Sequence, residues 1–85
     1  MTTVFFSDDD VIKLHSWWIN NCLSDDERKA KTVLLIDGEI IEITLEDEQK
    51  HMKAKTKIGE KLLKIYRNYF TYKLERGELK WPLEY

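Results

Sequence analysis

Residues 32–43 read TVLLIDGEIIEI and determine the centre of the fold. The two halves of this stretch are rich in β-branched and aliphatic side chains. They flank Asp37 and Gly38, a dipeptide typical of the two-residue type I′ turn. The sequence therefore predicts an antiparallel β-hairpin near the middle of the chain.

The register that this turn sets determines which side chains lie opposite one another. Leu34 pairs with Ile41 on one face and Leu35 pairs with Ile40 on the other, so both faces carry apolar groups that a covering layer can bury. A two-stranded sheet alone is only marginally stable in water. We therefore expect a terminal segment or a second copy of the chain to extend the sheet.

A helix is predicted after Ser7. The Ser7 hydroxyl can accept from the backbone amide three residues on, and Asp10 completes a capping box. At about 100° per residue, one half-circle of this helix is apolar and contains Val11, Ile12, Leu14, His15, Trp18, Ile19, Cys22 and Leu23. Trp17 lies outside that arc. It therefore either covers the edge of the core or serves as an anchor for a partner.

Further helices are predicted on both sides of the hairpin. A second capping box at residues 24–27 predicts a short helix. From Thr44 the pattern stays helical until Gly77, which is a natural C-terminal cap. This region forms either one helix of about 45 Å or two helices broken near residues 56–59. We favour two, because a glycine inside a helix costs about 1 kcal/mol relative to alanine.

Both termini suit extended structure. Residues 2–6 are β-branched and aromatic, which suits a short strand or an apolar arm, and residues 79–85 alternate between apolar and polar side chains as an edge strand does. The sequence thus predicts a single compact α+β domain over residues 1–85. Its elements are an N-terminal helix, a central hairpin and one or two C-terminal helices packed on the sheet.

Length and composition exclude several classes of protein. The chain has 85 residues, 42% of them hydrophobic, and a formal net charge of -2, and a domain of this size has little room for a deep substrate cleft beside its core. No apolar run approaches the length of a membrane span, and Asp8, Asp9 and Asp10 do not fit a signal peptide. The single cysteine excludes an internal disulfide and a cysteine cage for zinc. We expect a soluble, cytoplasmic protein.

The small net charge hides an uneven distribution. Residues 1–49 hold 4 basic and 12 acidic groups, whereas residues 50–80 hold 10 basic and 3 acidic groups. Either the two parts neutralise each other within the fold or the chain binds a charged partner. On a continuous helix, one stripe, which we call the lysine stripe, collects Lys50, Lys53, Lys57, Lys61 and Lys64, with Arg67 at its border. The stripe is either a solvated face or a footprint for phosphate groups or an acidic protein surface.

Catalytic and metal-binding patterns are weak. His15 and Cys22 share a helix face but lie about 10 Å apart along it, beyond the reach of a Cys–His pair. Asp47, Glu48 and His51 have a helical spacing that suits a metal, but the second half of such a motif is lacking. We therefore expect no enzymatic activity, no catalytic residue, no metal and no cofactor.

Composition adds an indication of function. Lysine outnumbers arginine 11 to 3 and alanine occurs only at positions 30 and 54, a bias typical of an AT-rich genome. In size and composition, over the whole chain, the protein resembles the small accessory proteins by which phages alter or inhibit host systems. That resemblance implies a non-enzymatic binder that occupies a surface of a host or defence protein in the host cytoplasm. Trp17 and the lysine stripe are the contacts we expect it to use.

Two alternatives stay open. The first is an RNA- or DNA-binding regulator that uses the lysine stripe, where lysine side chains contact the phosphate backbone rather than read bases. The second is a small structural subunit whose apolar hairpin edge pairs with another copy to form a homo-oligomer. We expect no membrane partner.

Overall fold

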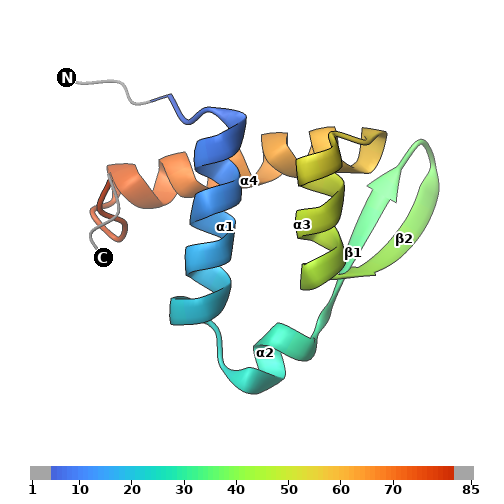
Figure 1. The fold of residues 1–85 in the computed structure, drawn as a ribbon, viewed down its shortest axis with the longest axis horizontal. Coiled ribbons are helices and arrows are strands. Elements are labelled where there is room, and N and C mark those ends of the chain that lie inside the picture. Colours follow the sequence, from blue (N-terminus) through green and yellow to red (C-terminus); the bar gives the residue numbers. More distant parts are fainter. Residues whose placement is uncertain (1–4, 82–85) are drawn as a thin grey trace.

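The computed structural model describes residues 5–81 of the chain. Its elements are α1 (Asp8–Cys22), α2 (Asp25–Lys29), β1 (Lys31–Ile36), β2 (Glu39–Thr44), α3 (Leu45–Ala54) and α4 (Lys57–Glu75). In Figure 1, α1 and α3 lie side by side, α4 crosses behind both, and the hairpin lies beside α3. The predicted α+β class and order of elements are confirmed. Within the described part of the chain, every helix is too short or too polar to span a membrane.

Each helix in residues 5–81 begins after a hydroxyl side chain that caps it. The hydroxyl accepts a hydrogen bond from the backbone amide three residues on, at 3.0 to 3.2 Å, and the capping residues are Ser7, Ser24, Thr44 and Thr56. The side chains of Asp10 and Glu27 return hydrogen bonds to the backbone and complete capping boxes on α1 and α2. The helix starts predicted at residues 7, 24 and 44 are therefore confirmed.

The long helical region is divided in two, as favoured from the sequence. Lys55 adopts the left-handed conformation (φ 53°) that ends α3, and its amide donates to the carbonyl of Met52 at 3.3 Å. Thr56 then caps α4, and its hydroxyl also lies 2.8 Å from Nδ1 of His51 on α3. The turn is thus closed by polar contacts between the two helices that it joins.

The hairpin has the predicted turn and register. Asp37 and Gly38 both have positive φ, 52° and 81°, which identifies the type I′ turn, and every cross-strand pair is the expected one. The sheet has only two strands within residues 5–81. Residues 5–6 and 79–81 form no strand, so the expected extension by a terminal segment is wrong for the residues described. The remainder of both terminal segments lies outside the described residues.

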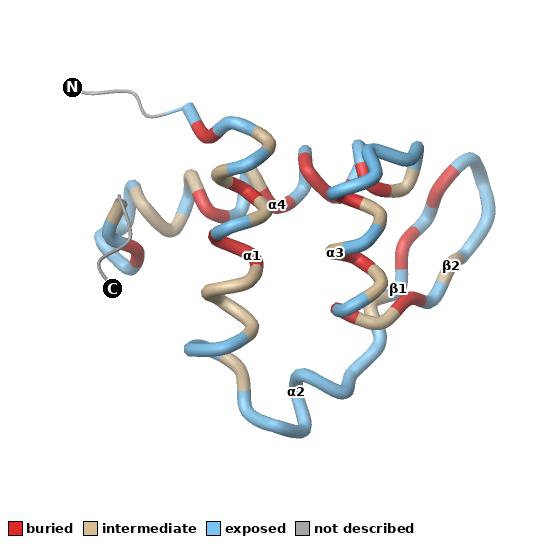
Figure 2. The backbone as a smooth tube through the Cα atoms, in the orientation of Figure 1, coloured by how far each residue is buried: buried red, intermediate tan, exposed pale blue. Residues whose placement is uncertain are grey.

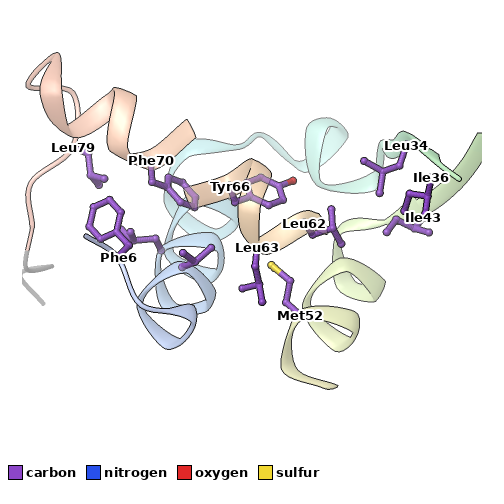
Figure 3. Close-up of a cluster of buried hydrophobic side chains, with 12 residues drawn as sticks. Phe6, Leu34, Ile36, Ile43, Met52, Leu62, Leu63, Tyr66, Phe70 and Leu79 are labelled. Atoms are coloured by element: carbon purple, nitrogen blue, oxygen red, sulfur yellow. The ribbon is translucent and has the colours of Figure 1, made fainter. Parts of the chain in front are cut away.

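The core fills the space where the three long helices meet and continues under the hairpin. Figure 3 shows Leu34, Ile36 and Ile43 of the hairpin in the same buried cluster as Met52 of α3 and Leu62 of α4. Along β1, buried positions alternate with exposed ones in the half that leads to the turn, as the colours of Figure 2 show. The hairpin is therefore held to the helices by one face.

Burial along α1 is confined to its first half. Val11, Leu14 and His15 are buried, but Cys22 is exposed. The expectation that Cys22 lies on a buried arc is therefore wrong. Figure 1 gives the reason, because α1 crosses α4 with its first half and its last turn extends past that crossing.

Candidate functional site

The lysine stripe is divided by the break between α3 and α4. Lys50 and Lys53 lie on α3, Lys57, Lys61 and Lys64 lie on α4, and all five side chains are exposed. The two helices cross at a steep angle in Figure 1, so the lysines form two groups instead of one line. The structure does not bring them together as a continuous helix would.

One lysine of the stripe is already paired. The ammonium group of Lys57 forms an ion pair with Asp37 at the tip of the hairpin. Lys55, in the turn before it, lies 3.6 Å from the carboxylate of Asp8. Among residues 5–81, the other four lysines of the stripe make no ion pair. They remain accessible to an anionic partner.

Arg67, the predicted border of the stripe, holds the chain's N-terminal segment against α4. Its Nε donates to the carbonyl of Phe6 at 2.7 Å, and its guanidinium group pairs with the carboxylate of Asp8. The guanidinium carbon also lies 5.1 Å from the ring centre of Phe5. With a side chain only 22% exposed, Arg67 is occupied by contacts within the fold.

Trp17 is half-buried and lines a groove of about 320 Å³ beside the C-terminal half of α4. The side chains of Trp18, Tyr69 and Phe70 give the groove further aromatic walls. Trp17 packs against the buried cluster, as a residue that covers the edge of the core does, and it also lines the groove. Its use as an anchor for a partner stays a prediction.

Two of the charged residues that line this groove form an ion pair. Lys73 Nζ lies 2.9 Å from the carboxylate of Glu78, and both residues line the groove. The Lys73 hydrogen bond lowers the pKa of the Glu78 carboxyl group, and the same bond raises the pKa of Lys73. This ion pair has no net charge and therefore does not attract a charged ligand to the groove.

A buried polar cluster joins the three long helices. The Tyr66 hydroxyl of α4 donates to Oε1 of Glu48 on α3 at 2.8 Å, and Nε2 of His15 on α1 lies 3.3 Å from the same oxygen. His15 and Glu48 are fully buried. Burial raises the pKa of Tyr66 most, and the nearby carboxylate of Glu48 raises it further. The Tyr66 hydroxyl therefore stays protonated and donates. Because substrate cannot reach buried groups, we assign this cluster to the stability of the fold.

The spacing that suits a metal does not produce a metal site. Glu48 turns into the core, whereas His51 bonds to Thr56 in the turn after α3. No group of three His, Cys, Asp or Glu side chains in the described ranges is arranged to hold a metal ion.

The outer face of the hairpin is apolar and uncovered. Val33 and Leu35 of β1 are 60% and 62% exposed, and Ile40 of β2 is 76% exposed. Leu35 and Ile40 are direct cross-strand partners, and Val33 lies two residues along β1 on the same face, so the three side chains are contiguous. We call these three residues the outer patch. Lys31 and Glu42 lie on the same face and supply a charge of each sign beside it.

The outer patch was not among the contacts predicted from the sequence. Apolar residues on both strand faces suggested that both faces are covered, but only the inner face is. One signal was present, because two charged residues, Lys31 and Glu42, share the strand face of Val33, Leu35 and Ile40, whereas the other face carries one, Glu39 beside the turn. In a hairpin that is apolar on both faces, the face with more charged residues is favoured to point to solvent.

No protein-family model, curated protein or solved structure matches the chain.

Proposed function

We propose that this protein is a non-enzymatic binding protein that docks its outer patch on an apolar surface of a protein partner and acts by covering that surface. The observation that carries the proposal is the exposure of three contiguous aliphatic side chains at 60% to 76%. Single exposed apolar residues are normal in soluble proteins, but contiguous patches mark interaction sites. Burying one such side chain in an interface contributes about 1.5–3 kcal/mol.

A protein partner fits this surface better than a nucleic acid does. The patch is aliphatic and has no aromatic ring on which a base could stack. Its flanking charges are of both signs, which matches the apolar centre and polar rim of protein interfaces. Size and composition extend the proposal to a host or defence protein as the partner, with inhibition as the consequence of the contact.

The outer patch should be dispensable for folding and required for binding. We expect the Leu35→Thr/Ile40→Thr variant to keep the thermal midpoint of the native chain within about 3 °C, because both side chains point to solvent and threonine suits a strand. Its affinity for the partner should fall about tenfold or more, the equivalent of 1.4 kcal/mol. The partner is captured from a lysate of a low-GC bacterium, identified and purified, and the affinity is measured by calorimetry.

The matched control is Ile65→Gln, which removes an exposed aliphatic side chain from α4 instead. It should bind the purified partner as the native chain does. Equal binding by Leu35→Thr/Ile40→Thr would contradict the proposal. So would a large loss of its thermal stability, since that would assign the outer patch to the fold.

A second candidate, a regulator that binds RNA or DNA, is favoured by the four stripe lysines without an ion pair in residues 5–81. If they form the site, labelled single-stranded RNA or duplex DNA should bind with strong salt dependence. Lys61→Glu/Lys64→Glu should then weaken binding about tenfold or more. Lys13→Glu, which alters an exposed lysine on α1, should have a much smaller effect. Fluorescence anisotropy at low and physiological salt measures this, and no binding even at low salt removes the candidate.

A further inference from the structure

The hairpin has free edges within the described chain. It is a two-stranded sheet, and no backbone hydrogen bond joins β1 or β2 to another element of residues 5–81. A free strand edge presents unpaired N–H and C=O groups that can pair with a further strand. Both edges can therefore accept a further strand.

The two edges differ in their charges. The β2 edge carries Glu39 and Glu42 and no basic residue, so pairing β2 with β2 of a second copy would collect four carboxylates. The β1 edge has one basic residue at its start, Lys31, and one acidic residue, Asp37, immediately after its end. Two antiparallel copies of β1 therefore place Lys31 near Asp37, which also pairs with Lys57 of its own chain, and they bring no carboxylates together as the β2 edge does. Like charges that face each other across strands are unfavourable.

The turn determines which backbone groups of β1 are free. Ile36 and Glu39 flank the two-residue turn and form its closing hydrogen-bonded pair, and pairs along an antiparallel ladder alternate. The N–H and C=O groups of Val33 and Leu35 consequently point away from β2. In a new antiparallel pair, these outward-facing residues must pair with one another.

We propose that β1 pairs antiparallel with β1 of a second copy of this chain, so that Leu34 lies opposite Leu34 of the second copy. This register pairs the outward-facing Val33 with Leu35 of the second copy, and it also places Lys31 opposite Asp37 of the second copy. The result is a continuous four-stranded sheet with a two-fold axis at Leu34. Three or more strands with an apolar face are stable where two are marginal.

The pairing also deepens the proposed function, on which this step rests. Because outward-facing residues pair with outward-facing residues, the outer patches of both copies lie on the same face of the joined sheet. Val33 and Leu35 of each copy become cross-strand neighbours. Two patches of three side chains thus merge into one apolar platform for the partner protein, which a single copy does not present.

The oligomeric state and its dependence on the β1 edge test the proposal directly. Sedimentation velocity of the full chain over a range of concentrations should show a reversible dimer. Val33→Pro removes an N–H group that points away from β2, so it should leave the hairpin intact and weaken the dimer about tenfold or more. The matched control is Glu42→Pro, at the residue that pairs with Val33, because it removes an outward N–H group from the β2 edge. This control should stay dimeric.

A disulfide test reports the register even if the proline variant fails to fold. In a Cys22→Ser background, copies with Val33→Cys and copies with Leu35→Cys should cross-link when mixed and oxidised, because Cα atoms of a hydrogen-bonded pair lie about 5.5 Å apart. Each variant alone should cross-link poorly, since residue 33 and residue 33 of the second copy are diagonal neighbours about 7–8 Å apart. Mass spectrometry of the non-reduced protein identifies the bond.

The outcomes separate this inference from the proposed function. The β1 pairing is overturned if the native chain stays monomeric at all concentrations. It is also overturned if either cysteine variant alone cross-links as well as the mixture of the two. In both cases the outer patch is still tested by Leu35→Thr/Ile40→Thr. A dimer that survives Val33→Pro but is lost in Leu35→Thr/Ile40→Thr indicates packing of two outer faces and also overturns the β1 pairing. A β1 dimer without any partner protein would confirm the pairing and contradict the proposed function.

Discussion

Replacing Glu48 by alanine should lower the free energy of unfolding by about 3–5 kcal/mol, because it leaves two groups of the buried polar cluster without a partner, at about 1–3 kcal/mol each, and it also leaves a cavity. Glu48 is fully buried and its Oε1 contacts both the Tyr66 hydroxyl and the His15 ring. Domains have a total stability of about 5–15 kcal/mol, so the loss is a substantial part of the stability of this chain. Urea denaturation followed by circular dichroism measures the loss.

Two companion variants identify the cause of that loss. Glu48→Gln keeps an oxygen that can accept from Tyr66, so its loss of stability should be smaller than that of the alanine variant. Tyr66→Phe removes only the donor and should cost about 1–3 kcal/mol, the typical effect of an unsatisfied buried group. If Glu48→Ala unfolds at the same urea concentration as the native chain, the buried polar cluster does not stabilise the fold as described.

The cluster also shows where sequence reasoning reached its limit. In the sequence, Glu48 stands among acidic residues that suit the first turn of a helix, and nothing in that pattern distinguishes it from the partly or fully exposed Asp47 and Glu46. Its burial depends on the approach of His15 and Tyr66, which are 33 and 18 residues away. Contacts of this range are set by the packing of helices and not by local periodicity.

Local features, by contrast, were predicted well. The turn at Asp37 and Gly38 and the caps at Ser7 and Ser24 depend on residues within three positions of each other, and all are present in the structure. The outer patch could not be identified with the same security, because strand alternation tells which residues share a face but not which face is covered. The lysine stripe was predicted for a continuous helix, and the break between α3 and α4 divides it into two groups.

Replacing Gly59 by alanine should destabilise the fold by about 3 kcal/mol, although the same change inside a helix normally contributes about 1 kcal/mol of stability. An added Cβ would lie 2.9 Å from the amide nitrogen of Met52 and closer still to the carbonyl group of His51. These are backbone atoms of α3, which cannot rotate aside, so the first turn of α4 has to move away. That movement disturbs the hydrogen bond of 3.0 Å from the Gly59 amide to Thr56, and it also loosens the packing of Leu62.

Thermal denaturation provides the measurement, since 1 kcal/mol corresponds to about 4–8 °C for a domain of this size. Gly59→Ala should therefore lower the midpoint by about 12 °C or more. Asn68→Ala, on an exposed position of the same helix, gains helix propensity without a clash and should leave the midpoint unchanged or slightly higher. Because the two variants introduce the same residue into the same helix, their difference isolates the contact between α3 and α4. A Gly59→Ala variant as stable as the native chain would mean that the two helices do not approach each other so closely, and the placement of Glu48 against Tyr66, which depends on that approach, would then have to change as well.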